Sequence, residues 1–115
     1  GKVDGREVVV AGDDFTVRGG AADARIGNKS LYSLKLAEHF RLPLINLVDG
    51  SGGGGSVKTL ETMGATYVPG LPSWQNIVRL LSMVPVVGAC MGSVAGLGSA
   101  RVVASHFSIM VKGSA

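Results

Sequence analysis

Glycine-rich segments that directly follow two short apolar runs are the feature that most constrains this fold. The run Leu44–Val48 leads into Asp49–Ser56, which contains four consecutive glycines. The run Met83–Ala89 is followed by Cys90–Ser93 and by further small residues. Short unbroken apolar runs are typical of strands covered on both faces in a parallel sheet. Glycine is used where a chain turns sharply or brings main-chain amides close to another group. The pattern therefore predicts buried strands that end in glycine turns.

Helices are predicted between these strands. Asn28 is a suitable N-cap for a helix that ends near Phe40, and Ser73 is a suitable N-cap for a second helix. A third helix is predicted to follow a turn at Cys90–Ser93, with small residues that allow close packing. The predicted apolar faces have helical spacing. They consist of Tyr32, Leu36 and Phe40 in the first helix and of Trp74, Ile77, Val78 and Leu81 in the second.

Both ends of the chain also have strand patterns. Arg6–Ala11 and Phe15–Val17 flank the turn Gly12–Asp14 and are predicted to form a strand pair. His106–Val111 is predicted to be the last strand. The alternation of strand, turn and helix predicts an α/β fold. Because right-handed crossovers bring the ends of parallel strands to one edge, both glycine turns are predicted to face one ligand.

The composition excludes several classes of protein. With 115 residues, the chain is one domain at most, and 46% apolar with 17% charged residues fits a folded α/β interior. The net charge of +3 is scattered, so no nucleic-acid partner is expected. No segment is apolar for long enough to cross a membrane, and the N-terminus lacks a signal-peptide pattern. A single cysteine and no metal-ligand spacing predict no disulfide and no metal, in a reducing compartment such as the cytoplasm or mitochondrial matrix.

Side chains suited to catalysis are missing from the pattern. There is no Ser/His/Asp order, and there are no paired carboxylates in an apolar setting. The two glycine segments instead offer main-chain N–H groups, near Gly53 or Gly54 in the first and near Gly96 or Leu97 in the second. Two such donors could form an oxyanion hole, where any Cβ would obstruct the approach of a carbonyl group. These four residues are the predicted catalytic groups.

Three segments in order, Phe15–Gly20, Val48–Ser56 and Pro85–Gly98, carry a family resemblance. They resemble the N-terminal, acyl-CoA-binding domain of the carboxyltransferase β subunit of biotin-dependent acyl-CoA carboxylases, the propionyl-CoA and methylcrotonyl-CoA carboxylase group. Phe107–Lys112 resembles the strand after the second loop. The resemblance covers essentially the whole chain. It implies a crotonase-like (ClpP/crotonase) α/β fold with a ββα spiral core, of which residues 1–115 are a partial domain.

The resemblance also implies a reaction. The family moves a carboxyl group from carboxybiotin to the α-carbon of an acyl-CoA, and the biotin nitrogen takes the α-proton before the enolate attacks. Two backbone amides hold the thioester oxygen. Coenzyme A enters as part of the substrate, and biotin is carried on a partner domain. The predicted coenzyme A contacts are Arg18, Gly20, Ala21, Ala22 and Gly92.

The implied partners are an acyl-CoA, a biotin carboxylase or biotin carrier subunit, and a second carboxyltransferase half within a homo-oligomer, which is a hexamer in the family. The biotin-binding half is not in this sequence, so the chain alone is expected to be inactive. Both ends look cut relative to the family domain. The first loop departs from the Asp-Ser-Gly-Gly-Ala-Arg form of propionyl-CoA carboxylases, which leaves the preferred acyl chain open.

Alternative interpretations of the same segments stay open. Ser51–Ser56 has the composition of a flexible linker, and Gly92–Gly98 that of a closely packed helix. Another crotonase-type enzyme, such as a decarboxylase, would share the fold, and the chain could also be a non-catalytic assembly fragment. Hydratases use carboxylates beside the second loop, where Ser99 and Ala100 stand. Nucleotide binding is disfavoured because neither loop has the Gly-x-Gly-x-x-Gly or Gly-Lys-Ser/Thr order.

Isolated polar residues are interpreted as structural. His39 and His106 are predicted to lie on a helix surface and a strand edge rather than to act as acid or base. Cys90 is predicted to be a small buried residue, because no histidine is near it in the sequence. Arg25 and Lys29 are compatible with coenzyme A phosphates, although scattered basic residues usually belong to the solvated surface.

Overall fold

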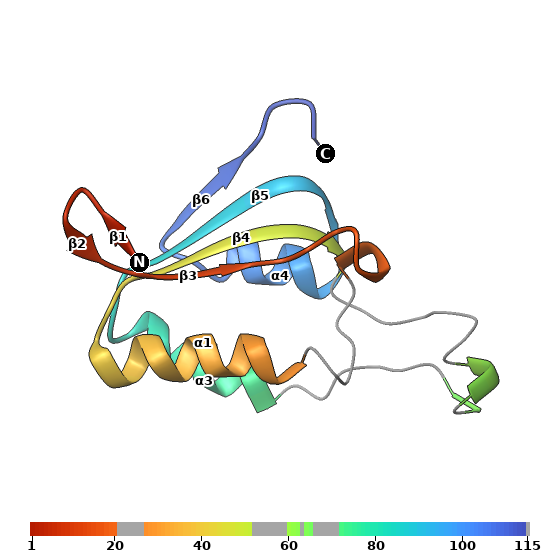
Figure 1. Ribbon diagram of the computed structural model, residues 1–115, viewed down its shortest axis with the longest axis horizontal. Helices are drawn as coiled ribbons and strands as arrows, with labels where there is room; N and C mark the ends of the chain where they lie inside the picture. The colour runs from red at the N-terminus through yellow and green to blue at the C-terminus, as the bar shows by residue number, and fades with distance from the viewer. Residues whose placement is uncertain (21–26, 52–59, 63, 66–71, 115) are drawn as a thin grey trace.

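The computed structural model describes residues 1–20, 27–51, 60–62, 64–65 and 72–114. Its central element is a four-stranded parallel sheet with the strand order β3-β4-β5-β6 (Figure 1). The strands are β3 (Val9–Gly12), β4 (Leu44–Ser51), β5 (Val86–Ala95) and β6 (Phe107–Met110). A short antiparallel hairpin, β1 (Lys2–Val3) and β2 (Arg6–Glu7), precedes the sheet. The helices are the 3₁₀ helix η1 (Arg18–Gly20), α1 (Gly27–Phe40), α3 (Pro72–Leu81) and α4 (Leu97–Val103). In the described part of the chain, no helix is long and apolar enough to cross a membrane.

The predicted parallel sheet is confirmed, and β4 lies in its centre between β3 and β5. The apolar run Leu44–Val48 forms most of β4, but the strand continues through Ser51. Likewise, β5 runs through Cys90–Ser93, where a turn into a helix is predicted, and ends only at Ala95. Val48 pairs with Cys90, and after a register shift Gly50 and Ser51 pair with Val94 and Ala95. Hydrogen bonding to a neighbouring strand therefore overrides the local turn preference of these small residues, and the third helix begins later than predicted.

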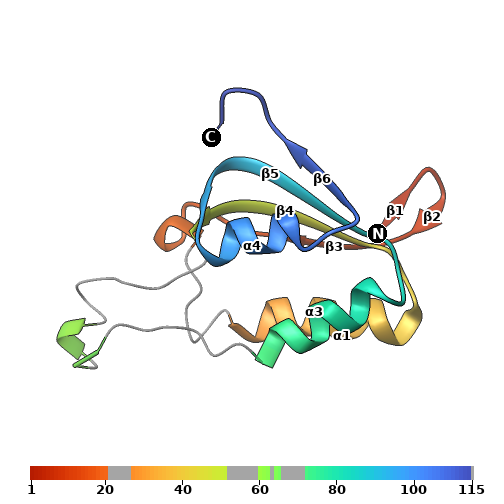
Figure 2. The same cartoon turned by 180° about the vertical axis from the view of Figure 1, so that it is seen from behind.

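Apolar side chains bury one face of the sheet beneath the helices. Figures 1 and 2, seen from opposite sides, show α1, α3 and α4 on this same face. The buried residues of the main core are Val9, Leu34, Ala37, Leu44, Leu80, Val84 and Val86. A smaller core beneath α4 consists of Val48, Cys90 and Val102. Because β4 contributes to both cores, burial of its apolar side chains holds the central strand against all three helices.

The opposite face of the sheet is open in the described part of the chain. Val10 of β3 and Phe107 of β6 are 48% and 62% exposed, and Ile109 is 46% exposed. For the strand at Leu44–Val48, the prediction of cover on both faces is wrong at Leu47, which is 36% exposed. The strand order follows the chain order, so connections of one hand place every helix on the same side.

The buried face of α1 differs from the predicted one. Tyr32 and Phe40 are 67% and 60% exposed, whereas Leu34 and Ala37 are buried in the main core. The helix carries two apolar stripes, and its contacts with α3 and β3 select the stripe with i, i+3 spacing. Helical spacing alone does not distinguish the two stripes.

The helix α3 also begins and packs differently from the prediction. It starts at Pro72, so Ser73 lies inside the helix rather than at its N-cap. Proline is favoured at the first helical position, where its missing N–H costs nothing. Val78 is 64% exposed, and Leu80 takes its place in the core at 1% exposure. Ile77 and Leu81 pack against the core as predicted.

Residues 15–17 form a turn rather than a strand. Asp14 Oδ1 accepts a hydrogen bond from the hydroxyl of Thr16 at 2.6 Å and another from its main-chain N–H at 2.9 Å. The N–H of Val17 donates to the Asp14 carbonyl at 3.1 Å. These local bonds replace the strand pairing that the apolar pattern predicts. The same two bonds, that of the hydroxyl above all, lower the pKa of the exposed Asp14 carboxyl.

Close packing of α4 on β5 generates a first prediction. A Cβ at Gly88 would lie 2.7 Å from the Val102 carbonyl oxygen of α4, so Gly88→Ala must push the helix away from the strand. We expect a loss of about 1–3 kcal/mol in the free energy of unfolding, measured by denaturant titration of the protein that contains this chain. Gly12→Ala is the matched control, because its nearest neighbour, the Leu47 Cβ, lies at an ordinary 3.9 Å. Equal losses in both variants would contradict the proposed contact.

Candidate functional site at the carboxyl edge of the sheet

The strands β4 and β5 end side by side at the carboxyl edge of the sheet. Ser51, the last residue of β4, is paired with Ala95, the last residue of β5. The register shifts between Val48 and Gly50, so β5 has an irregularity just before this edge. Each glycine segment singled out in the sequence follows or contains one of these strand ends. The sheet therefore brings the starting points of both segments together.

The backbone of η1 packs directly against the end of β4. A Cβ at Gly20 would overlap the carbonyl oxygen of Asp49, and a Cβ at Gly50 would overlap the carbonyl oxygen of Gly19. Gly20 and Gly50 also have positive φ angles of 68° and 103°, which side chains with a Cβ rarely adopt. Two independent constraints thus require glycine at both positions.

Two further glycines complete the surroundings of the β4 end. A Cβ at Gly92 of β5 would overlap the carboxylate oxygen Oδ1 of Asp49. A Cβ at Gly98 of α4 would lie 2.8 Å from the carbonyl oxygen of Gly50. Four segments, η1, β4, β5 and α4, therefore meet closely around Asp49 and Gly50.

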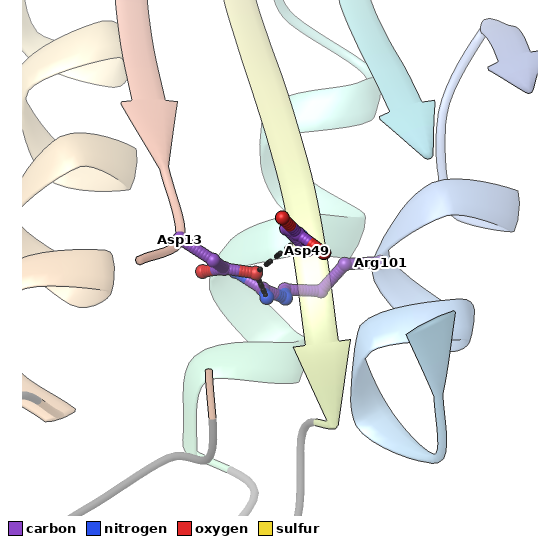
Figure 3. Close-up of polar contacts among 3 residues, drawn as sticks. All are labelled: Asp13, Asp49 and Arg101. Carbon is purple, nitrogen blue, oxygen red and sulfur yellow. Dashed lines mark hydrogen bonds and ion pairs between the residues drawn. The ribbon is translucent and has the colours of Figure 1, made fainter. Parts of the chain in front are cut away.

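A polar cluster links three of the elements that meet at this edge. Figure 3 shows Arg101 extending from α4 across β4 to Asp13, which follows β3. Asp13 Oδ2 accepts from Arg101 Nη2 and also, at 3.3 Å, from the main-chain N–H of Asp49. The side chains of Arg101 and Asp13 are only 23% and 19% exposed. The main-chain N–H of Asp13 donates to the Leu47 carbonyl at 3.0 Å, which fixes the backbone that carries the carboxylate.

The turn between β5 and α4 presents main-chain groups to solvent. Gly96 has a φ of 58° and a ψ of −126°, a conformation suited to glycine, and a Cβ there would meet no atom within 4 Å. Leu97 is the first residue of α4, so its N–H has no acceptor one turn earlier in the helix. Among the described residues, no backbone acceptor is paired with it. The turn therefore offers an available donor at an exposed place.

This architecture is found in a known family. A model of the carboxyl transferase domain matches residues 1–115. The chain belongs to the carboxyl transferase domain family. A solved single-chain, multi-domain long-chain acyl-CoA carboxylase is similar to this carboxyl transferase domain, with a TM-score of 0.72 and 27% sequence identity. The match covers 90% of this chain and 10% of the carboxylase, so the chain spans about a tenth of that protein. No curated protein matches the chain.

These findings confirm the family resemblance and the predicted crotonase-like α/β fold of a carboxyl transferase domain. They do not test the predicted site residues. Of the predicted catalytic residues, Gly96 and Leu97 lie at the carboxyl edge, whereas Gly53 and Gly54 lie outside the described residues. The coenzyme A contacts divide in the same way. Gly20 and Gly92 surround Asp49, the backbone of Arg18 begins η1, and Ala21, Ala22 and the Arg18 side chain lie outside the described part.

Three polar groups of the carboxyl transferase domain have structural contacts. His106 Nδ1 accepts a hydrogen bond from the Val86 N–H at 3.0 Å, which ties the start of β5 to the segment before β6. Cys90 is buried and its thiol donates to the Gly92 carbonyl at 3.3 Å. No sequence pattern indicated the Asp13–Arg101 pair. Its members are 88 positions apart, and each looks like an ordinary turn or surface residue.

Adjacent glycines at η1 provide a second prediction. Gly19 and Gly20 have φ angles of 64° and 68°, but only the Gly20 Cβ position is filled, by the backbone of Asp49. Gly19→Ala should therefore cost only the left-handed strain of roughly 1–2 kcal/mol. Gly20→Ala should cost roughly 1–3 kcal/mol more, because η1 must move off β4. Thermal unfolding of the two variants compares them directly. A Gly19→Ala variant as unstable as Gly20→Ala would show that the contact with β4 contributes nothing.

Proposed function

We propose that this domain binds the acyl-CoA in a carboxyltransferase that moves a carboxyl group from carboxybiotin to the α-carbon of the thioester. The observation that carries the proposal is the pairing of Ser51 with Ala95. Neighbouring strands lie about 5 Å apart, so the two glycine segments start within reach of one carbonyl oxygen. The similarity to an acyl-CoA carboxylase supports the same substrate class.

Carboxylation at the α-carbon requires an enolate, and the negative charge of an enolate develops on the thioester oxygen. Main-chain N–H groups fixed around that oxygen stabilise the charge without any change in their own protonation. We assign this role to the amide of Gly53 or Gly54 from the first loop and the amide of Gly96 or Leu97 from the second. The second donor is supported by the exposed turn at Gly96 and by the N–H of Leu97, which has no backbone acceptor among the described residues.

The coenzyme A moiety is proposed to lie along η1 and the segment that follows it. Arg18 would meet a phosphate through its guanidinium group, whose planar donors suit phosphate oxygens. Ala21 and Ala22 follow η1 directly in the sequence. Gly20 and Gly92 already contact Asp49, so we assign them the shape of the site rather than a direct bond to the ligand.

Biotin, carried on a partner domain, would supply the carboxyl group and accept the α-proton in this reaction. A base delivered by the cofactor fits a carboxyl edge where the Asp13 carboxylate already accepts from Arg101 and from the main-chain N–H of Asp49. The exposed turn at Gly96 leaves the edge accessible to a group that arrives from another domain. The carrier, a second carboxyltransferase half and a homo-oligomer are therefore proposed partners, in the cytoplasm or mitochondrial matrix. The isolated chain is expected to be inactive.

A decarboxylase of the same fold is the alternative function. It would use the same amides, because loss of carbon dioxide from an acyl-CoA also leaves an enolate. The two activities differ in their need for biotin. Product formation that depends on carboxybiotin supports the carboxyltransferase, whereas release of carbon dioxide from a carboxylated acyl-CoA without biotin supports the decarboxylase.

Replacing Leu97 by proline generates a third prediction. Proline is tolerated at the first helical position, so Leu97→Pro removes the proposed donor while leaving α4 able to form. We expect kcat of the full-length parent carboxylase to fall about 100-fold or more relative to Leu97→Ala, which loses the side chain but keeps the N–H. Carboxylated acyl-CoA is the product to measure, with circular dichroism as the check on folding. Equal rates for the two variants would remove this amide from the mechanism.

A further inference from the structure

We propose that Asp13 and Arg101 are positioning residues that align the turn at Gly96 and Leu97 with the end of β4. The proposal rests on the function assigned above, because that function makes the relative placement of the two glycine segments important. The proposal adds two side chains to the site. They are distant in sequence from each other and donate no hydrogen bond to the thioester, but the placement of the proposed main-chain donors depends on them. Neither residue is proposed to touch the substrate.

The hydrogen bonds of Asp13 join the elements that carry the two proposed donors. One carboxylate oxygen accepts from both Arg101 on α4 and the main-chain N–H of Asp49 on β4 (Figure 3). Arg101 lies four residues after Leu97, so both occupy the same side of α4, one turn apart. The Asp13 carboxylate therefore connects α4 directly to β4, the strand that leads into the first glycine segment.

The other described hydrogen bonds between α4 and the sheet reach β5 and β6: the Ser99 hydroxyl donates to the Val94 carbonyl at 3.0 Å, and the Ser108 hydroxyl donates to the Val102 carbonyl at 2.9 Å. The helix has only seven residues, and it meets the sheet through the small positions Gly88 and Gly98 and the buried Val102. Arg101 reaches across β4 to Asp13, which follows β3, so among the described side chains of α4 it is the one joined to the β3 side of the sheet.

The surroundings of Arg101 offer no packing that would replace its side chain. It borders a cavity of about 40 Å³ between the sheet and the helices, together with Ala11, Asn46 and Ala104. A shortened or uncharged side chain at this position leaves free space beside it. Because a displacement of about 1 Å at a catalytic group lowers rates by up to about 100-fold, a small shift of α4 would affect turnover.

The experiment compares two ion pairs of the same chemical type in the full-length holoenzyme. Arg101→Met removes the pair at the carboxyl edge, and Arg79→Met removes the pair between Arg79 and Glu38 on the helices α3 and α1. Arg101→Met should lower kcat about tenfold with KM for the acyl-CoA changed by less than about twofold, since misplaced donors weaken binding of the transition state selectively. Arg101→Lys should recover part of the lost rate. Arg79→Met should change neither constant.

A double variant distinguishes positioning from general stability. In the Leu97→Pro background, Arg101→Met should reduce kcat by less than about twofold, because the donor that it aligns is already gone. Multiplicative losses in the double variant would overturn the proposal. So would an unchanged kcat in Arg101→Met, or a loss carried by KM alone.

Failure of the proposed function has its own signature, equal kcat values for Leu97→Pro and Leu97→Ala. Hydrogen exchange then tests the alignment of α4 with the end of β4 directly, without a measurement of activity. Arg101→Met should speed amide exchange in residues 94–101 and 47–51, and Arg79→Met should not. Unchanged exchange in those segments would overturn the alignment, whatever the kinetic result.

Discussion

The close backbone contacts around Asp49 and Gly50 are the constraint on which the rest of the carboxyl edge depends. Gly20 of η1 and Gly98 of α4 lie against main-chain carbonyl oxygens of β4, and Gly92 of β5 lies against the Asp49 carboxylate. Atoms in such contacts have little freedom, because a shift in one segment produces overlap with another. The edge is therefore rigid, because these glycines bring into contact segments that a Cβ would keep apart.

Rigid backbone suits a site whose proposed donors are main-chain amides. An amide has no pKa in the range of solution chemistry, so nothing in its protonation needs tuning, and its effectiveness depends on placement alone. Placement here follows from the pairing of Ser51 with Ala95 and from the orientation of α4 on the sheet. Hydrogen bonds between the strands fix the pairing, and the charged pair of Asp13 and Arg101 is proposed to fix the orientation of α4. A partly exposed ion pair contributes little to stability, so its value at this edge lies in orientation.

The sequence was sufficient to predict the order of elements and the parallel sheet, because short apolar runs and helical spacing are strong local signals. It was insufficient for the faces of the helices. In α1, Phe40 is as apolar as the buried Leu34, and only the position of the sheet and of α3 decides between the two stripes. It was also insufficient where tertiary pairing opposes local preference, as in the extension of β5 through Gly92. In the turn after β3, the side chain of Asp14 outweighed the apolar pattern of the residues that follow.

The sequence also identified the glycines of this edge without showing why each of them is needed. Composition shows that glycine is needed at this edge, but only the structure shows what occupies the space that a Cβ would take. At Gly20, Gly50, Gly92 and Gly98 that space is filled by the chain itself, so these residues are explained by packing. At Gly96 the space is empty and the requirement comes from a positive φ in an exposed turn. A residue whose backbone is both fixed and open to solvent is the kind that a substrate can reach. Glycines that are required by packing thus have close neighbours, whereas Gly96 has none. This difference favours the turn at Gly96 as the place where a ligand meets the described main chain.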